Sequence, residues 1–359
     1  MDHGGDRLFR LGLLLAGGGA AVRRRVAESG GGGDLAMALA AADLPRTTLE
    51  TARRLAETDA ERVCARLAEK GWRWAVPEDE DYPPMLRGLG DAPLGLFVRG
   101  RLADGPVAAI VGSRSATPYG RQVARLLGEE LARSDVVVAS GMARGVDAAA
   151  HAGTIASGGD TWAVWGTGPD RIYPAEHAAL AEEIARSGAI LTEYPPGTPP
   201  RRHHFPERNR ILAGLAQVVV VVEAAARSGA LITARLALEE GREVMAVPGN
   251  IFSELSVGPN TLLRVGARPL LTPRDLFDAI GVEPAAETTR QAANSLLSLF
   301  EAGKALTADE FAHRAEIDSA AAASELLKLE LDGEIAQSPD GTYSLVRPPL
   351  PDRRGEGGP

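Results

Sequence analysis

The sequence predicts an α/β protein with a doubly wound parallel sheet at its centre. From residue 107 onward, short apolar runs alternate with stretches of helical periodicity. The apolar runs lack the alternation of a half-exposed strand, so both faces of each strand are expected to be buried under helices. Glycine-containing turns follow the apolar runs. This order is that of repeated β–α units in one parallel sheet.

The predicted sheet domain covers residues 105–280, a length that is normal for one domain. Its six expected strands are 107–111, 136–139, 162–165, 189–192, 218–222 and 244–247. The helices expected between them are 120–133, 146–156, 175–187, 208–215 and 230–240. Because such strands run in one direction, ligands are expected at the edge formed by their carboxyl ends.

Two segments are predicted before the sheet domain. Residues 1–70 are expected to form a small helical module in which glycine clusters separate the helices. Its expected helices are 7–16, 20–29, 34–41 and 47–70. A helix–glycine–helix unit could hold a DNA backbone through its amides, and packing or contact with another protein is the alternative reading. Residues 71–104, with Trp72, Trp74 and the sequence Asp81-Tyr82-Pro83-Pro84, are expected to be an irregular connector.

The C-terminal part has the element order of a winged helix, that is, three helices followed by a β-hairpin. After a linker at 281–290, an amphipathic helix is expected over 291–301. Thr307 and Glu310 have capping-box spacing for a second helix, and Asp318 caps a third. The hairpin is expected at 334–346, which ends the winged-helix domain over 291–346. Residues 347–359 are rich in proline and glycine and are expected to be a disordered tail.

Composition narrows the class of protein. The chain has 359 residues, 45% of them hydrophobic, and a single cysteine, Cys64. One cysteine excludes a disulfide framework and fits a reducing cytoplasm. The leucine-rich run at 11–15 is too short to span a bilayer and precedes three arginines at 23–25, so no membrane helix or signal peptide is predicted. A soluble cytoplasmic protein is expected.

The net charge of −9 is unevenly distributed. Residues 105–280 carry 17 arginines against 18 acidic side chains, whereas residues 287–346 carry 4 basic and 11 acidic side chains. An acidic total does not exclude a local cationic groove, because phosphate contact depends on the field at the site. Because the C-terminal domain is acidic, its local field disfavours contact with phosphate. A contact with another protein or a regulatory role is therefore favoured for this domain.

The stretch at 195–210 is the most cationic and proline-rich in the sheet domain. Its first half contains four prolines, which favour a loop. Its charged and aromatic residues include Arg201, Arg202, Phe205, Arg208 and Arg210, with Glu207 as the single acid. A loop with guanidinium groups and one ring at the end of a buried strand suits an anionic partner with flat faces. Cations with a stacking ring are typical of single-stranded nucleic-acid binding.

Other strand-end loops are candidate phosphate-binding loops. Gly112-Ser113-Arg114 follows the first strand, Ser140-Gly141 the second, and Ser228-Gly229 precedes the helix after the fifth. Glycine lets backbone amides approach an anion, and a helix N-terminus adds partial positive charge. These loops do not match the Walker or dinucleotide-binding fingerprints.

Each of these features also has a purely structural explanation. The glycines could serve only tight turns, Arg114 could pair with an acid, and Phe205 could cover the edge of the core. Asn209 could satisfy backbone groups. Asp147 and His151 are spaced i,i+4, but a metal site there would need further ligands. No serine has a clear base and no carboxylate pair stands out, so a binder without cofactor or metal is favoured over an enzyme.

Several motifs together resemble the DprA/Smf family of DNA-processing proteins, in the order of that family and over about residues 105–280. These motifs are Ile110-Val111-Gly112-Ser113-Arg114, Thr117-Pro118-Tyr119-Gly120, Ser140-Gly141-Met142-Ala143-Arg144-Gly145-Val146-Asp147, Ile172-Tyr173-Pro174, Glu193-Tyr194-Pro195-Pro196-Gly197, Phe205-Pro206-Glu207-Arg208-Asn209-Arg210-Ile211, Ser228-Gly229-Ala230-Leu231-Ile232-Thr233 and Gly241-Arg242-Glu243 through Pro248-Gly249. The flanking helical module, the Asp81–Pro84 segment and the winged helix match the layout of the family.

The resemblance implies an extended Rossmann-like fold that dimerises and binds single-stranded DNA. It further implies protection of incoming strands during natural transformation, loading of RecA recombinase, and single-strand-binding protein as a further partner. Phosphate contact is implied for Gly112, Ser113 and Arg114, strand contact for Arg202 and base stacking for Phe205. The full predicted DNA-binding set is Gly112, Ser113, Arg114, Ser140, Gly141, Arg202, Phe205, Arg208, Asn209, Arg210, Ser228 and Gly229.

The sequence departs from the family pattern at two places. Arg202 stands where lysine is common, and Trp165 stands where a small aliphatic residue is usual, which is expected to reshape that strand end. The glycine region at 17–19 is looser than a helix-hairpin-helix turn. Two other functions remain open, namely a nucleotide-processing enzyme of the lysine-decarboxylase-like phosphoribohydrolase type and a regulatory protein that acts through its winged helix.

Overall fold

The computed structural model describes residues 3–18, 22, 44–285, 297, 299–300, 305–315, 317–331, 334–338 and 340–346. The chain forms two compact units, residues 1–284 and 285–359, which are described separately here. In the described part, no helix is long and apolar enough to cross a membrane.

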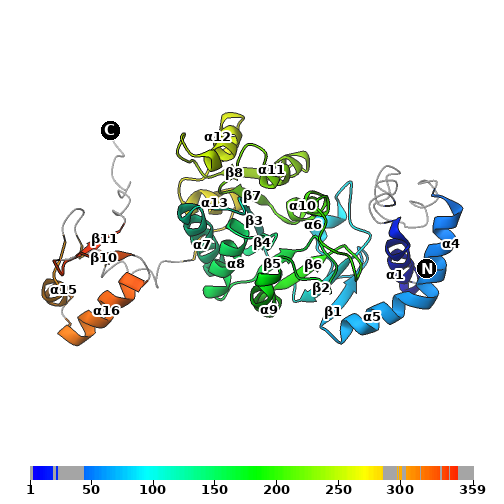
Figure 1. Ribbon diagram of the computed structural model, residues 1–359, viewed down its shortest axis with the longest axis horizontal. Helices are drawn as coiled ribbons and strands as arrows, with labels where there is room; N and C mark the ends of the chain where they lie inside the picture. Colours follow the sequence, from blue (N-terminus) through cyan, green and yellow to red (C-terminus); the bar gives the residue numbers. More distant parts are fainter. Residues whose placement is uncertain are drawn as a thin grey trace. The chain divides into compact units, whose positions relative to one another are not determined.

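The larger unit is built on a nine-stranded sheet with the order β1-β2-β6-β5-β4-β3-β7-β8-β9 (Figure 1). The strands are β1 (Trp72–Ala75), β2 (Leu96–Gly100), β3 (Val107–Val111), β4 (Val137–Ser140), β5 (Thr161–Val164), β6 (Ala189–Thr192), β7 (Val218–Val221), β8 (Glu243–Ala246) and β9 (Arg268–Pro269). Strands β3 to β9 are parallel. The predicted α/β class and all six predicted strands are therefore confirmed.

Both faces of the parallel strands are buried, as their apolar runs predict. In β3, Val107, Ala109 and Val111 face one hydrophobic core, and Ala108 and Ile110 face the other. Helices α10 (His204–Leu215) and α11 (Gly229–Glu239) cover the first face. Helices α7 (Pro118–Arg133), α8 (Val146–Ala156) and α13 (Pro273–Ile280) cover the second. The remaining helices of this domain are η3 (Ala175–His177), α9 (Ala178–Ser187), η4 (Glu254–Ser256) and α12 (Val257–Arg264).

The prediction of an irregular connector over 71–104 is wrong. Strand β2 pairs antiparallel with β6, with Phe97 opposite Thr192, and β1 pairs antiparallel with β2. Between these strands lies α6 (Pro84–Arg87), and Tyr82 and Leu86 are fully buried in the same core as α10. The segment therefore extends the sheet, and its pairing depends on a strand about ninety residues away, which local periodicity does not show.

The N-terminal helices pack on the sheet rather than standing apart from it. They are α1 (His3–Leu13), η1 (Leu14–Gly18), α4 (Arg46–Leu55), η2 (Ala56–Ala60) and α5 (Glu61–Ala68). Leu11, Val63 and Leu67 share a core with Trp72, Trp74 and Ile190. The helices predicted over 20–29 and 34–41 lie outside the described residues, apart from Val22.

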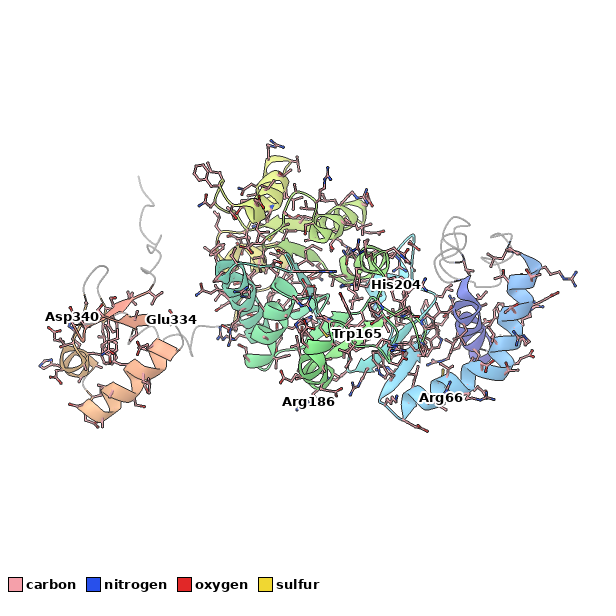
Figure 2. All side chains as sticks on the ribbon, viewed as in Figure 1. Arg66, Trp165, Arg186, His204, Glu334 and Asp340 are labelled. Carbon is pink, nitrogen blue, oxygen red and sulfur yellow. The ribbon has the colours of Figure 1, made fainter. Side chains whose placement is uncertain are left out.

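Trp165 belongs to this same core. Its ring meets that of Trp72 edge to face, with 5.6 Å between the ring centroids, and the residue is 3% exposed. Trp165 is labelled in Figure 2. The unusual tryptophan at the end of β5 thus packs under the N-terminal helices. It is absent from the pocket described below.

The C-terminal unit has the predicted winged-helix elements in the residues that the structure describes. Helix α15 (Ala308–Ala315) begins with the predicted capping box, in which Thr307 Oγ1 accepts from Glu310 N and Glu310 Oε2 accepts from Thr307 N. Asp318 accepts from two amides at the start of α16 (Ser319–Leu331). Strands β10 (Ile335–Gln337) and β11 (Tyr343–Leu345) form the hairpin. The helix expected over 291–301 lies almost entirely outside the described residues.

Candidate nucleic-acid interface

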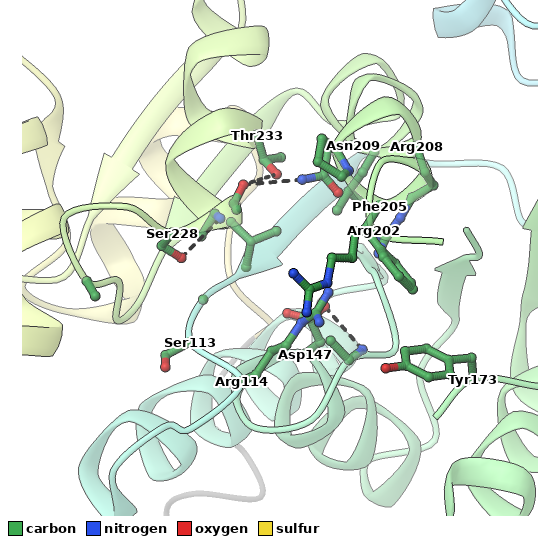
Figure 3. Close-up of a pocket in the computed structure, with 18 of the residues that line it drawn as sticks. Ser113, Arg114, Asp147, Tyr173, Arg202, Phe205, Arg208, Asn209, Ser228 and Thr233 are labelled. Carbon is green, nitrogen blue, oxygen red and sulfur yellow. Dashed lines mark hydrogen bonds between the residues drawn. The ribbon is translucent and has the colours of Figure 1, made fainter. Parts of the chain in front are cut away.

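A pocket of about 580 Å³ lies where the strand order reverses, at the carboxyl ends of β3 and β7. From β3 the chain builds the sheet outward through β4, β5 and β6, and then returns to β7 on the other side of β3. The loops after β3 and β7 therefore diverge and leave a crevice, which is where open α/β sheets bind ligands. Figure 3 shows residues from these loops, from α8 and from α10 around one opening.

The loop after β3 supplies one wall of the pocket through Gly112, Ser113 and Arg114. In the described part of the chain, the backbone amides of these three residues have no hydrogen-bond acceptor. Gly112 must lack a side chain, because a Cβ there would lie 2.5 Å from Val146 Cγ2. The Ser113 carbonyl accepts from Val146 N at 3.2 Å, which fixes the loop on the start of α8. Three amides are thus available to an anion.

An aromatic and cationic cluster forms the next wall. The Arg114 guanidinium lies over the Phe205 ring, 5.0 Å from its centroid, and the Tyr173 ring packs on Phe205 with 5.3 Å between centroids. Phe205 is partly buried, whereas Tyr173 and Arg114 are exposed. The cation–π contact holds Arg114 at the pocket. A base could stack on this cluster while its phosphate meets the guanidinium.

Arg202 reaches the same pocket from the loop that precedes α10. It is exposed, and within the described residues its side chain makes no ion pair or hydrogen bond. Helix α10 begins at His204, earlier than the predicted start at 208, because Pro206 falls in the first turn, where proline is tolerated. Phe205 therefore lies on the helix, which fixes the ring more firmly than a loop would.

The N-terminus of α11 faces the pocket from the β7 side. Ser228 caps the helix by accepting a hydrogen bond from Ala230 N at 3.2 Å. Gly229 is exposed, and a Cβ at this position would meet nothing within 4 Å, so the approach to the helix end is open. The helix dipole adds partial positive charge here.

Two buried charges, Arg208 and Asp147, line the floor of the pocket. Asp147 Oδ2 accepts from Gly141 N and Ala143 N at 3.2 and 3.3 Å, which holds the loop after β4. Burial raises the pKa of Asp147, and the Arg208 charge opposes this rise. Burial also lowers the pKa of Arg208 to about 10, against the effect of Asp147, so Arg208 remains charged at neutral pH.

Three residues of the predicted DNA-binding set lie outside the pocket. Ser140 is fully buried and donates to the Ile110 carbonyl at 2.6 Å, so it joins β4 to β3. Gly141 is buried, and both its amide and its carbonyl are used within the protein. Arg210 is 9% exposed and pairs with Glu193 at 2.6 Å and Asp91 at 3.1 Å. All three residues take part in contacts within the protein.

Asn209 has a mainly structural position within the pocket wall. It is 9% exposed, and its Nδ2 donates to the Gly229 carbonyl at 3.2 Å, which joins α10 to the start of α11. The predicted residues that the pocket does bring together are Gly112, Ser113, Arg114, Arg202, Phe205, Arg208, Asn209, Ser228 and Gly229.

Sequence reasoning missed two residues that line the pocket, Tyr173 and Asp147, and the buried Glu223 outside its lining. Tyr173 supports Phe205 from a segment that is remote in sequence, although it lies in one of the quoted motifs. Asp147 lines the pocket and holds the loop after β4, which its i,i+4 spacing with His151 did not reveal; His151 instead bonds Thr161. The buried Glu223 accepts from Thr117 N and fixes the start of α7 beside the end of β7. No local signal distinguishes these roles.

Comparison with known proteins identifies relatives over most of the chain. The model of the family described as DNA recombination-mediator protein A matches residues 73–281, and that of the DprA winged helix domain matches residues 277–341. Protein Smf of Escherichia coli (strain K12) is 39% identical over 292 residues, which are 76% of this chain and 77% of that protein.

Two solved structures are also similar. The X-ray structure of DNA processing protein A (DprA) from Streptococcus pneumoniae has a TM-score of 0.66 at 32% identity, over 76% of this chain and 97% of that chain. A structure that addresses the single-stranded DNA binding mode of DNA processing protein A from Helicobacter pylori has a TM-score of 0.51 at 30% identity. It covers 57% of this chain and 94% of that chain.

Proposed function

The chain belongs to the DNA recombination-mediator protein A family, and on this basis we propose that it binds single-stranded DNA in the pocket between β3 and β7 as a recombination mediator. The relative from Helicobacter pylori is described by its single-stranded DNA binding mode. This relationship agrees with the resemblance that the motifs indicate.

The observation that carries the proposal is the convergence of Arg114, Arg202 and Phe205 on one pocket together with free backbone amides. Guanidinium groups and amides bind phosphate without regard to sequence. The Phe205 ring offers a stacking surface for any base. Because contacts to phosphate and stacking on a ring do not distinguish one base from another, binding with little sequence preference is expected.

Binding to an oligothymidine strand in a mobility shift tests the proposal. We expect wild-type protein to bind at low salt and Arg202→Ala to bind about tenfold more weakly, because one charged contact to phosphate is lost. The slope of log affinity against log salt should fall by about 0.7, the value for one phosphate contact on a single strand.

Arg144→Ala is the matched control. Arg144 is an exposed arginine outside the pocket, where it pairs with Glu176. This variant should bind as the wild type does. Absence of wild-type binding at low salt would contradict the proposal. Turnover of nucleotides by the purified protein would favour the enzyme alternative, whereas we propose a binder without catalytic activity.

We further propose that the protein acts in the cytoplasm by loading RecA recombinase onto strands coated by single-strand-binding protein, and so protects incoming DNA during natural transformation. The family assignment and the proposed strand site support this role. The protein should shorten the lag before RecA hydrolyses ATP on coated strands, and Arg202→Ala should shorten it less. An unchanged lag with wild-type protein would refute the loading role.

A homodimer is also proposed, through the edge of the sheet that ends at β9. The segment from α11 to β9 and just beyond it carries exposed apolar side chains. They are Leu238, Ile251, Phe252, Val257, Val265 and Leu271, with Phe252 90% exposed. Neighbouring exposed apolar side chains, such as those of Ile251 and Phe252, commonly mark a protein interface. Ile211, Leu212 and Leu215 are buried core residues, so they are not available to a dimer interface.

Phe252→Asp should convert the proposed dimer to a monomer, because it places a charge in an apolar interface. Sedimentation velocity measures the change. Leu327→Asp, an exposed apolar residue of the C-terminal unit, is the matched control and should leave the mass unchanged. A wild-type protein that sediments as a monomer at micromolar concentration would rule the dimer out.

A further inference from the structure

We propose that the pocket between β3 and β7 is built for a phosphomonoester dianion, that is, the phosphorylated end of a strand or a free nucleoside monophosphate. For strand ends, this inference rests on the proposed function, because it names which phosphate of the DNA occupies that site. It follows from the charge, the depth and the arrangement of donors in the pocket.

The charge of the lining exceeds what one backbone phosphate needs. Arg114, Arg202 and Arg208 face a single carboxylate, that of Asp147, so two positive charges remain. A phosphodiester carries one negative charge. A phosphomonoester carries between about 1.5 and 2 at pH 7, because its second pKa is near 6. A terminal phosphate therefore matches the charge of the pocket more closely than an internal one.

Arg208 is the observation that points to a ligand at the floor. This residue is only 4% exposed, and among the described residues its side chain makes a single hydrogen bond, from Nη2 to the Gly141 carbonyl at 3.3 Å. Its buried Nε has no partner among the described residues. Burial of a guanidinium group with so few hydrogen-bond acceptors costs free energy, unless an anion accepts from its remaining donors. A Cβ at Gly141 would lie 2.1 Å from Nη1, so the glycine makes the room for this cation.

Donors reach the floor from opposite walls. The free amides of residues 112–114 come from the β3 side, and the open N-terminus of α11 at Ser228 and Gly229 comes from the β7 side. A monoester has three terminal oxygens to accept from such donors, whereas a diester has two. The pocket volume of about 580 Å³ is within the range that holds one small ligand. Phe205 lies beside it for the attached base.

The first test compares short oligothymidines of about eight nucleotides that end in 5′-phosphate, 3′-phosphate or only hydroxyl groups. A short strand makes its ends a large share of the available sites. Fluorescence anisotropy on the full chain should show about tenfold tighter binding of one phosphorylated form, the gain expected from one further charge-assisted contact. Equal affinity of all three strands would overturn the inference for strand ends and leave the proposed function standing.

A pH series provides an internal check on the wild-type protein. The advantage of the phosphorylated strand should fall toward one between pH 7.5 and about pH 5, because the monoester then carries one charge like a diester. The charged and titratable groups that line the pocket are Arg114, Arg202, Arg208, Asp147 and Tyr173. Protonation of Asp147 would strengthen binding of the phosphorylated and the unphosphorylated strand alike and would leave the ratio of their affinities unchanged. An advantage that persists at pH 5 would contradict the dianion.

Binding of free nucleotide distinguishes a phosphorylated strand end from a nucleoside monophosphate as the ligand. It also separates the phosphomonoester inference from the proposed binding of single-stranded DNA. Thymidine monophosphate, titrated by calorimetry, should bind at least tenfold more tightly than thymidine if the pocket accepts a free monoester. If no strand binds, the proposed function fails, and the titration with free nucleotide alone decides the inference. Equal weak binding of thymidine monophosphate and thymidine would then refute the inference. Arg208→Gln should abolish the advantage of phosphate while Arg144→Gln preserves it. Arg114→Gln replaces Arg208→Gln if thermal unfolding shows that the latter is misfolded.

Discussion

Arg210→Met should lower the free energy of unfolding by about 3–5 kcal/mol, the typical cost of removing one partner from a buried ion pair. Arg210 is 9% exposed, and its guanidinium lies 2.6 Å from the carboxylate of Glu193, a residue that is 4% exposed. The variant removes the arginine of this buried ion pair. Urea denaturation followed by circular dichroism measures the loss. We expect the midpoint Cm to fall and the slope m to stay unchanged.

Two controls separate this effect from a role in binding. Asp91→Asn removes the partner with the more exposed side chain, 39% against 5% for Glu193, and should cost about 1 kcal/mol or less. The double variant Arg210→Met/Glu193→Gln should recover part of the loss, because the buried side chain at position 193 is then neutral. At a temperature where Arg210→Met is folded, it should bind oligothymidine as the wild type does. A loss of affinity in the folded variant would return Arg210 to the DNA-binding set.

Arg114→Ala should weaken binding of oligothymidine by about 10- to 100-fold at low salt, since a hydrogen bond to a charged group contributes about 1.5–3 kcal/mol. Arg114 makes the cation–π contact with Phe205, and its own backbone amide is one of the free donors of the loop. Its removal takes away a phosphate contact and also loosens the ring. Anisotropy titrations at several salt concentrations measure both the affinity and the slope.

Stability distinguishes this result from unfolding. Arg114 is exposed, so its alanine variant should melt within a few degrees of the wild type. Arg125→Ala, on the exposed face of the following helix with Glu129 as partner, is the matched control. It should leave affinity unchanged. Equal affinity of Arg114→Ala and wild type would remove the central contact of the proposed site.

The sequence by itself determined the features that depend on local physics. Unbroken apolar runs such as Val107–Val111 became strands buried on both faces, and the Thr307–Glu310 pair became a capping box. Phosphate binding is predicted for the loop Gly112-Ser113-Arg114, because glycine at a strand end lets backbone amides approach an anion. Its convergence with Arg202 and Phe205 followed from the rule that parallel strands place their carboxyl ends at one edge.

Only the tertiary structure decided which residues of one motif face the pocket. Arg208 and Arg210 lie two positions apart on α10, so their side chains point about 200° apart around the helix. Arg208 lines the pocket, whereas Arg210 faces Asp91 and Glu193. A sequence shows the spacing of the two arginines but not which helix face meets the crevice. Strands β1 and β2 were hidden for a related reason, because their place in the sheet is set by pairing with β6, a partner remote in sequence.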